Sequence, residues 1–371
     1  MSANATVENK NESPAQGPIV KFYGDSDLME PAAYIEELQQ VSNRKVIERD
    51  FYGVGGVVAA LEKKFEEITG KEKSVFMPSG TMANQFAIAV LSGDNTKVFV
   101  QDTSHVYRDE ADAAQSVFNK RLMPLAKGET YFTAAALKQA VELLDDEEVF
   151  KSGIGAVSIE NPVRRANGKV VPIEEIRKIS EYCRSNNIRL HLDGARIYLA
   201  SAWSGVSIKE YASYFDTIYI SLYKYLGANA GAVLSGDKTV MNRMEHLVKI
   251  HGGTMFSNWT NAAVALHKME GIESLLQNVV KRADELFATL NKLEGITINL
   301  LTGGTNIFSL QIGKDINGEK LRDLLAKDFS IRIPRPDKNN FVHLMVNESL
   351  LYRDNAFIGQ AFSKAIKMAK K

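Results

Sequence analysis

The chain has 371 residues, and its 45 lysines and arginines balance its 45 aspartates and glutamates to a formal net charge of zero. A neutral chain lacks the basic excess that nucleic acids and anionic membrane surfaces attract, so we expect neither as a partner. The length suits two or three structural units with a sizeable core. The single cysteine, Cys183, cannot form an internal disulfide, which favours a reducing compartment, and we expect a cytoplasmic protein.

The chain begins with a polar stretch. Residues 1–17 lack the basic start and apolar middle of a signal peptide, so we expect a disordered tail there, followed by an N-terminal arm over residues 18–50. The apolar run at residues 84–92 is far shorter than the roughly 20 residues that span a bilayer. We therefore expect no membrane-spanning helix.

Short runs of β-branched and aromatic residues alternate with helical patterns between residues 50 and 240. The runs are apolar nearly throughout, as strands of a sheet buried on both faces are. The expected strands are 74–77, 97–101, 154–160, 188–193, 217–222 and 230–234. The helices expected between them are 57–69, 82–92, 134–144, 173–186 and 208–215.

The pattern changes near residue 261, where a long helical stretch over residues 262–293 begins. It is followed by strand patterns near 297–301, 305–312 and 340–346, a helix near 319–327 and a terminal helix. We predict an α/β protein with a large domain over residues 51–260, built on a mostly parallel seven-stranded sheet. A smaller α+β domain is expected over residues 261–371.

Polar residues stand where the predicted strands end, and ligands of open α/β sheets bind outside the carboxyl ends of the strands. One strand ends at Asp193, and Lys224 follows the next strand along the chain. The strand at 74–77 is connected by a short turn to the following helix, and His105 lies four residues past the end of the strand at 97–101. The turn into that helix contains Ser79, Gly80 and Thr81.

These residue types suit one cofactor. A helix N-terminus with the hydroxyls of Ser79 and Thr81 nearby is an anion site that fits a phosphate monoester. A carboxylate such as Asp193 can keep a pyridine nitrogen protonated, and an amine such as Lys224 can form a Schiff base. The imidazole of His105 can stack on a flat ring. Together these groups indicate pyridoxal 5'-phosphate (PLP).

Each residue also has an ordinary structural interpretation. Lys224 could be a surface lysine, Asp193 a helix N-cap, and His105 a hydrogen-bonded structural histidine. Arg196 could form a plain ion pair, and Arg165, with the arginine before it, could belong to a solvated basic pair. The paired occurrence of Lys224 and Asp193 after adjacent predicted strands favours the cofactor interpretation.

Residues 188–236, which contain HLDGAR and SLYKYLGA, are similar to the corresponding segment of the threonine aldolase and β-eliminating lyase family. The segments VFMPSGTMANQ, SHVYRDEAD and HGGTM match the family as well. The resemblance covers residues 51–271 and extends more loosely to residue 346. It implies the fold of type I PLP-dependent enzymes, with PLP as cofactor.

The resemblance also implies roles for single residues. Lys224 would form the Schiff base, Asp193 would hold the ring nitrogen, and His105 would stack on the ring. Gly80 and Thr81 would bind the phosphate. The remaining residue, Arg196, would lie beside the 3'-oxygen of the ring and the phosphate.

The chain departs from the family where the substrate carboxylate binds. The family's N-terminal Ser-Asp-Thr segment has only a weak counterpart at Ser26, and its small-domain arginine has no match in residues 339–344. A bidentate guanidinium suits a carboxylate, so another arginine can replace the missing one. The candidates are Arg165, Arg332 and Arg335.

The implied reaction is retro-aldol cleavage of a β-hydroxy-α-amino acid, L-threonine or L-allo-threonine, to glycine and an aldehyde. His105 would remove the β-hydroxyl proton, directly or through water. The alternatives are a β-eliminating lyase that acts on another amino acid, and a protein with this fold that binds PLP without turnover. The resemblance further implies a homo-oligomer, either a dimer or a tetramer.

Other patterns in the sequence give no indication of a further functional site. The glycine-rich stretch at residues 53–58 lacks the last glycine of a dinucleotide-binding motif. The histidines form no metal-ligand spacing, and we expect no metal. We also expect His191 and Asp193 to face opposite sides of their strand, which argues against a metal shared by them. Cys183 falls in a predicted helix, where a buried thiol is expected.

Overall fold

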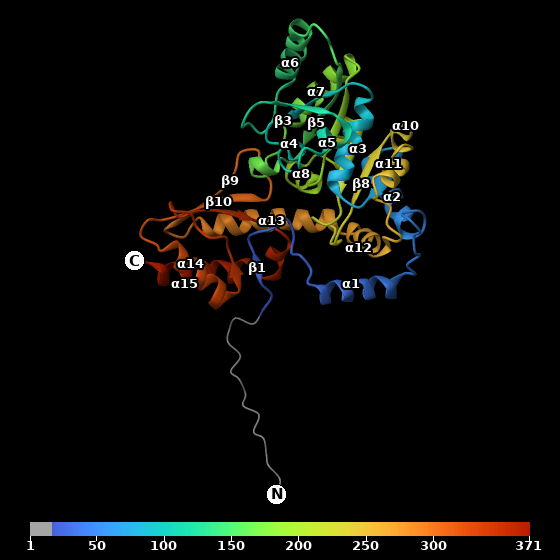
Figure 1. The fold of residues 1–371 in the computed structure, drawn as a ribbon. Helices are drawn as coiled ribbons and strands as arrows, with labels where there is room; N and C mark the ends of the chain where they lie inside the picture. The colour runs from blue at the N-terminus through green and yellow to red at the C-terminus, as the bar shows by residue number, and fades with distance from the viewer. Residues whose placement is uncertain (1–16) are drawn as a thin grey trace. The chain divides into compact units, whose positions relative to one another are not determined.

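The computed structural model describes residues 17–371, which form two compact units (Figure 1). The larger unit contains residues 28–277 and 301–306, and the smaller one contains the described residues up to 27, residues 278–300 and residues 307–371. The division lies within helix α13, Ile272–Leu290. The predicted disordered tail lies, up to residue 16, outside the described residues. The predicted domain boundaries after residues 50 and 260 stay a prediction, because a domain is defined by independent folding and not by compactness alone.

The larger unit is built on a seven-stranded sheet with the strand order β2-β8-β7-β6-β5-β3-β4. Strand β8 runs antiparallel to both β2 and β7, and the other neighbouring strands are parallel. This confirms the predicted mostly parallel sheet. The strands are β2 Lys73–Met77, β3 Lys97–Gln101, β4 Arg121–Leu125, β5 Ile154–Glu160, β6 Arg189–Asp193, β7 Thr217–Ser221 and β8 Ala232–Gly236.

Helices cover both faces of this sheet, and the strand side chains alternate between them. Leu190 and Leu192 of β6 belong to a buried cluster that includes residues of α2, α6, α7, α8, α9 and α12. On the other face, Tyr219 of β7 and Val75 of β2 pack against Phe86 of α3. The candidate site lies on this second face.

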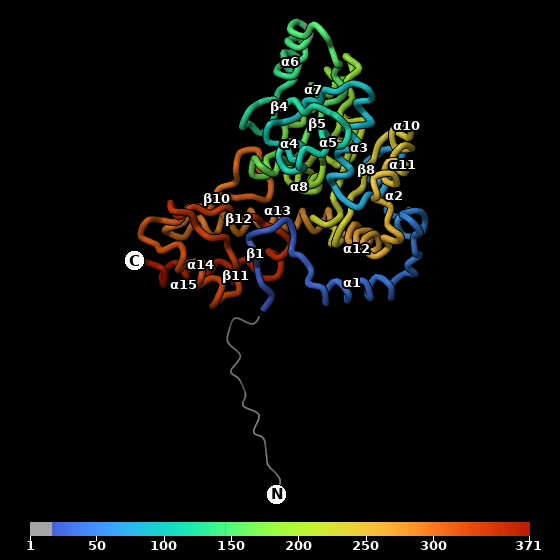
Figure 2. Tube along the Cα trace, viewed as in Figure 1, coloured from blue at the N-terminus to red at the C-terminus, as the bar shows by residue number. Residues whose placement is uncertain are grey.

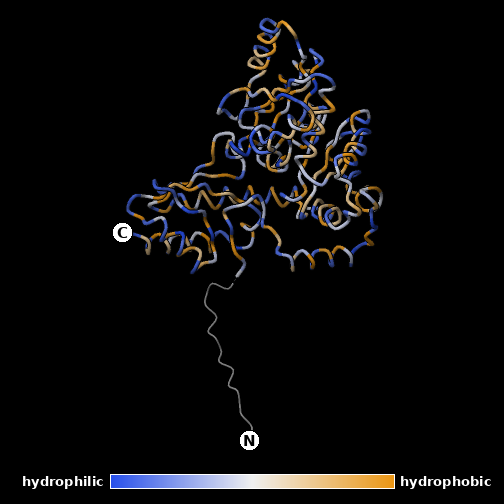
Figure 3. The backbone as a smooth tube through the Cα atoms, in the orientation of Figure 1, coloured by the Kyte–Doolittle hydropathy of each residue, from blue (hydrophilic) through white to orange (hydrophobic). Residues whose placement is uncertain are grey.

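The helices of the larger unit agree with the predicted helices in most places. Their bounds are α1 Pro31–Arg44, α2 Gly56–Thr69, α3 Gly80–Ser92, α4 His105–Arg108, α5 Ala113–Phe118, α6 Ala134–Glu147, α7 Ile173–Ser185, α8 Ile197–Ser204, α9 Ile208–Ser213, α10 Lys238–Met241, α11 Met244–Ile250 and α12 Trp259–Met269, with a 3-10 turn at Arg164–Ala166. Along α1, hydrophobic and hydrophilic residues alternate (Figure 3). The buried thiol expected at Cys183 is confirmed, and burial raises the pKa of this thiol to about 12.

Several elements differ from the sequence-based expectation, and two of these differences have a plain physical cause. The strand β4 was not predicted, because Pro124 interrupts its pattern; the sheet tolerates this proline because β4 is an edge strand. The long helix expected over residues 262–293 is two helices, α12 and α13, separated by Gly271. Glycine is a poor residue for a helix interior, and here it stands between the two helices.

The opposite edge of the sheet, strand β2, is covered by carboxylates of helix α2. Glu62 Oε1 accepts a hydrogen bond from the backbone N–H of Phe76 at 2.8 Å, and Glu66 Oε1 accepts one from Ser74 at 3.1 Å. Burial raises the pKa of the Glu62 carboxyl to about 7. The outward N–H groups of this edge strand are therefore satisfied by side chains of the chain itself.

The smaller unit contains a three-stranded antiparallel sheet in the order β12-β10-β9 and a parallel pair, β1 with β11 (Figure 2). This agrees with the expected α+β character of the C-terminal region. The elements are β1 Val20–Lys21, β9 Ile296–Leu300, β10 Ile307–Ile312, α14 Gly318–Phe329, β11 Ile331–Arg332, β12 Phe341–Met345, a 3-10 turn at Glu348–Tyr352 and α15 Asn355–Ala369. Over residues 17–371, no helix is both long enough and apolar enough to cross a membrane.

Candidate active site

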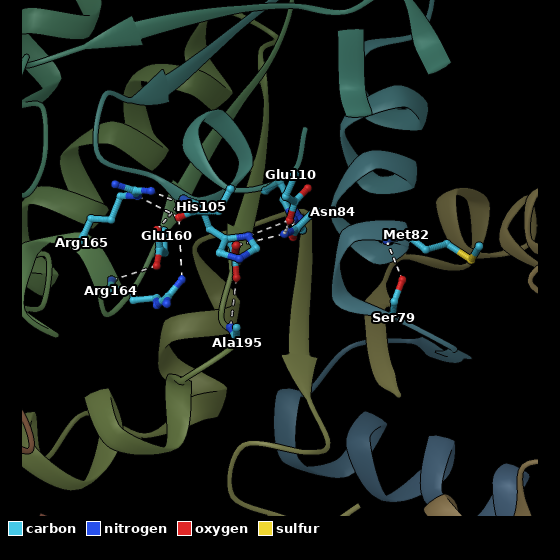
Figure 4. Close-up of polar contacts among 12 residues, drawn as sticks. Ser79, Met82, Asn84, His105, Glu110, Glu160, Arg164, Arg165 and Ala195 are labelled. Atoms are coloured by element: carbon cyan, nitrogen blue, oxygen red, sulfur yellow. Dashed lines mark hydrogen bonds and ion pairs between the residues drawn. The ribbon is translucent and has the colours of Figure 1, made fainter. Parts of the chain in front are cut away.

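The turn between β2 and α3 brings a helix N-terminus to the sheet. Ser79 is the N-cap residue, and its Oγ accepts a hydrogen bond from the backbone N–H of Met82 at 3.3 Å (Figure 4). Gly80 follows with no room for a side chain, because a Cβ there would lie 2.1 Å from the hydroxyl of Tyr219. The backbone of the turn can thus approach a ligand closely.

Asp193 ends strand β6 and is buried at 2% exposure. Its Oδ2 accepts a hydrogen bond from Asn84 Nδ2 at 3.0 Å, and its Oδ1 accepts one from the backbone N–H of Ala195 at 3.2 Å. The carboxylate is therefore held by two donors and lines the cavity at the end of the strand.

His191 shows that one expectation was wrong. His191 Nε2 lies 3.0 Å from Oδ1 of Asn84, the same residue that binds Asp193, so both side chains are on the α3 face of β6. Residues two apart on a strand point to the same face, which the expectation of opposite sides overlooked. His191 is fully buried; burial lowers its pKa to about 4, so the imidazole is neutral at physiological pH.

His105 begins the short helix α4, and its Nδ1 lies 2.9 Å from Oε1 of the buried Glu110. This hydrogen bond raises the pKa of His105, against the opposing effect of partial burial. Burial raises the pKa of Glu110 in turn. Glu110 Oε1 also accepts a hydrogen bond from Asn84 at 2.8 Å, so the same amide contacts Glu110 and Asp193.

Glu160 is a further buried carboxylate, at the end of β5. Its Oε2 accepts the backbone N–H of His105 at 2.7 Å, and its Oε1 accepts that of Arg164 at 2.9 Å (Figure 4). Burial raises the pKa of Glu160 to about 7. Glu160 thereby ties the start of α4 to the loop that follows β5.

Lys224 lies just beyond β7 and is buried at 8% exposure. Its Nζ is 3.3 Å from the hydroxyl of Tyr223 and 4.8 Å from the centre of that ring. The interpretation of Lys224 as a surface lysine is therefore wrong. Its amine lines the cavity beyond the end of β7, where it can reach a bound ligand.

These side chains line one cavity of about 260 Å³ in the larger unit. It includes seven residues predicted from the sequence: Ser79, Gly80, Thr81, His105, Asp193, Arg196 and Lys224. The sequence reasoning gave no role to others in its wall, chiefly Glu110, Glu160, Tyr219, Tyr223 and Asn229. Among these, Glu110 lies within the quoted segment SHVYRDEAD, five residues after His105, which is the signal that could have identified it.

The four residues considered for the substrate carboxylate, Ser26, Arg165, Arg332 and Arg335, do not line this cavity. Arg165 is exposed, and its Nε donates a hydrogen bond to Asp109 Oδ2 at 2.9 Å, which holds the pKa of Asp109 below its usual range. Arg335 donates to Glu319 at 2.8 Å within the smaller unit, which also contains Ser26. Their substrate roles stay predictions.

A metal was not expected, and one group of described residues has the atoms to hold one. The ligand atoms of His105, Glu110 and Asp193 all lie within 4.8 Å of one another. Glu110 and Asp193 already accept hydrogen bonds from Asn84, and Glu110 is bonded to His105. These partners account for the cluster without an ion, and the expectation of no metal stays a prediction.

The residues that line the cavity fit PLP. The side-chain-free position at Gly80, beside the start of a 13-residue helix, can approach a phosphate. The buried, doubly hydrogen-bonded carboxylate of Asp193 can face a protonated pyridine nitrogen, and the buried amine of Lys224 can bind an aldehyde carbon.

The mostly parallel seven-stranded sheet and the residues at its carboxyl edge define an α/β protein of the fold-type I class. A candidate L-allo-threonine aldolase from Listeria monocytogenes has this fold, with a TM-score of 0.78 and 22% identity over 96% of this chain and 98% of that one. The chain belongs to the beta-eliminating lyase family, whose sequence profile matches residues 36–312. PLP is the cofactor of this family.

Two curated proteins are similar in sequence to part of this chain. A low-specificity L-threonine aldolase of Candida albicans is 39% identical over 212 residues, which are 57% of this chain and 56% of that protein. An alanine racemase of Cochliobolus carbonum is 35% identical over 53% of this chain and 50% of that protein. The chain thus aligns with little more than half the length of these two relatives.

Proposed function

We propose that the chain is a PLP-dependent carbon-carbon lyase that cleaves a β-hydroxy-α-amino acid, L-threonine or L-allo-threonine, to glycine and an aldehyde. The observation that carries the proposal is the convergence of Lys224, Asp193 and the N-terminus of α3 on one cavity. Family membership and the similarity to proteins named threonine aldolases support it.

When bound, PLP supplies an electron sink that weakens the bonds at the α-carbon of an attached amino acid. Lys224 would hold the cofactor through its aldehyde carbon, and the substrate amino group would take the place of the Lys224 amine. Asp193, fixed by Asn84 and Ala195, would keep a proton on the ring nitrogen. Ser79, Gly80 and Thr81 would bind the phosphate, with Arg196 at the same cavity wall.

His105 would stack on the ring and accept the β-hydroxyl proton, directly or through water. Its Nδ1 is engaged by Glu110, which leaves Nε2 for that proton. Glu110 raises the pKa of His105, so the base form becomes more populated as the pH rises above that pKa. This sets the acidic side of the expected pH profile.

The substrate carboxylate would be bound by a guanidinium. Arg165 is paired bidentately with the carboxylate of Asp109, a geometry that supports its choice as a carboxylate ligand. Arg335 and Ser26 of the smaller unit complete the set that we propose. Removing the required arginine should raise KM for the amino acid far more than it changes PLP binding.

A second candidate reaction begins at the Cα–H bond. The similarity to a protein named alanine racemase favours keeping it, because racemisation and β-elimination both start by breaking that bond. The third candidate is a PLP-binding protein without turnover. The buried Lys224 and the ordered carboxylate of Asp193 favour an enzyme over this last candidate.

The test uses purified protein loaded with PLP. A visible absorbance band that borohydride fixes to the chain, with the mass label on Lys224, is expected; Lys224→Ala should lose the label. L-threonine and L-allo-threonine should then yield glycine and acetaldehyde, measured with a coupled alcohol dehydrogenase. Release of a keto acid or conversion of L-alanine to D-alanine, with no aldehyde, would replace the aldolase by a reaction at Cα–H. A bound cofactor with no product from any amino acid would support the non-catalytic alternative.

We also propose a homo-oligomer, dimer or tetramer, and a cytoplasmic location. The larger unit exposes a cluster of apolar side chains, Phe51, Tyr52, Val54, Met255 and Phe256, each at least 48% exposed. Exposed apolar clusters of this kind mark association surfaces. The neutral charge supports the absence of nucleic-acid and membrane partners.

A further inference from the structure

Asn84 is fully buried, and both polar atoms of its side-chain amide make hydrogen bonds beneath the cavity. Its Nδ2 donates to Asp193 Oδ2 at 3.0 Å and to Glu110 Oε1 at 2.8 Å, one N–H for each carboxylate. Its Oδ1 faces His191 Nε2 at 3.0 Å. Figure 4 shows Asn84 beside Glu110. Asn84 belongs to α3, the helix that begins at the cavity.

The direction of this amide follows from its two carboxylate partners, and His191 and Thr217 lie behind it. Thr217 Oγ1 lies 2.8 Å from Nδ1 of His191, and both residues are fully buried. The two carboxylates take the N–H side of the amide, so its Oδ1 faces His191. A neutral imidazole with its one hydrogen on Nε2 then donates to Asn84 Oδ1, while its Nδ1 accepts from the Thr217 hydroxyl. The reversed amide would place an oxygen against two carboxylates and lose both charge-assisted bonds.

We propose that Asn84 is a positioning residue that couples Asp193 to the Glu110–His105 pair, with His191 and Thr217 completing the hydrogen bonds behind its amide. The inference rests on the proposed function, because the proposed function is what makes Asp193 and His105 contacts of the cofactor. One amide thus aligns the carboxylate meant for the ring nitrogen and, through Glu110, the imidazole meant for the ring face.

The first test is the dissociation constant for PLP, measured by titrating the apoprotein and following the absorbance of the bound cofactor. Asn84→Ala should raise this constant about tenfold or more, because the Asp193 carboxylate loses a charge-assisted hydrogen bond that orients it. His191→Phe keeps a ring but removes both nitrogens, and should weaken binding as well. His191→Gln keeps an N–H donor, and should restore affinity to near the wild-type value.

The control variant is Ser74→Ala, which removes a buried hydrogen bond of 2.7 Å to Ser235 in the same sheet but away from the cavity wall. It should leave PLP affinity unchanged. The unfolding temperature of each apoprotein shows whether a variant is folded, so that a loss of affinity is read only from folded protein.

The second test addresses coupling. Glu110→Gln and Asn84→Ala are combined in a double-mutant cycle on PLP affinity, and their effects should be non-additive by about fivefold or more. In the apoprotein, the pKa of His105 measured by NMR should also change in Asn84→Ala, because Glu110 loses the donor that orients it. A role limited to folding would move neither quantity.

The outcomes separate the two proposals. A wild-type protein that binds no PLP would overturn the proposed function, and the inference with it. A wild-type protein that binds PLP, together with a folded Asn84→Ala variant whose dissociation constant is within twofold of wild type, would overturn the inference alone. Additive effects in the cycle, with an unchanged His105 pKa, would overturn the coupling.

Discussion

At the scale of single residues, the cavity is a set of carboxylates and cations whose protonation is set by burial and by direct partners. The hydrogen bond that His105 makes to Glu110 raises the pKa of His105, and burial raises the pKa of Glu160 to about 7. Lys224 and Asp193 could be predicted from the sequence because each stands at or just beyond the end of a strand. Asn84 was not, since a lone polar residue in a helix has no pattern that distinguishes a buried one from a solvated one.

Changing Glu110 should move the pH profile of the proposed reaction. Glu110→Gln removes the negative partner that raises the pKa of His105, so His105 becomes a free base at lower pH. The acidic limb of kcat/KM should shift to lower pH. The measurement is the pH dependence of aldehyde release, with NMR titration of His105 as the direct control. An unchanged limb would show that another group acts as the base.

At the scale of elements, the turn from β2 into α3 depends on one residue without a side chain. A Cβ at Gly80 would collide with the Tyr219 hydroxyl, so Gly80→Ala must displace either the helix start or the tyrosine. We expect PLP affinity to fall about tenfold, in keeping with a strain of about 1–3 kcal/mol. Gly271→Ala is the matched control, because a Cβ there meets nothing within 4 Å. Equal affinities in both variants would contradict the close approach.

The carboxylate of Glu62 should make stability depend on pH. Its pKa in the folded chain, about 7, lies above the ordinary 4.5, so its contribution to stability is complete below about 4.5 and is lost as the pH rises through 7. Glu62→Gln removes this dependence, and relative to wild type it should gain up to about 3 kcal/mol in free energy of unfolding between pH 5 and pH 8. Denaturant unfolding at both pH values measures it. The exposed Glu142→Gln should show no such gain.

The sequence predicted the buried strands well and the irregular elements poorly. Strands β3 and β5 coincide with the predicted ranges because apolar runs between polar turns leave little ambiguity. The edge strand β4 and the four-residue helix α4 carry too few periodic residues to be recognised. The network under the cavity joins residues far apart in the chain, which only the folded sheet brings together.

At the scale of the whole molecule, the neutral charge leaves apolar surface as the main basis for association. Phe256 of the exposed apolar cluster lies 5.4 Å from Tyr52 and 6.0 Å from Phe51, measured between ring centres. We expect Phe256→Asp to shift the protein towards monomer in sedimentation velocity. Val149→Asp, at a site outside this cluster that is 86% exposed, should leave the assembly unchanged. A wild-type protein that sediments as a monomer would contradict the proposed oligomer.

The carboxylates of Glu62 and Glu66 on the edge of β2 also constrain how copies can meet. An uncovered edge strand is a template on which another chain can add a strand, the first event in sheet-mediated aggregation. Here two of the outward N–H groups are already occupied from within the chain. Copies of this protein should therefore associate through side-chain surfaces and not by continuing the sheet at β2, and removing both carboxylates should turn an orderly assembly into one prone to fibre formation.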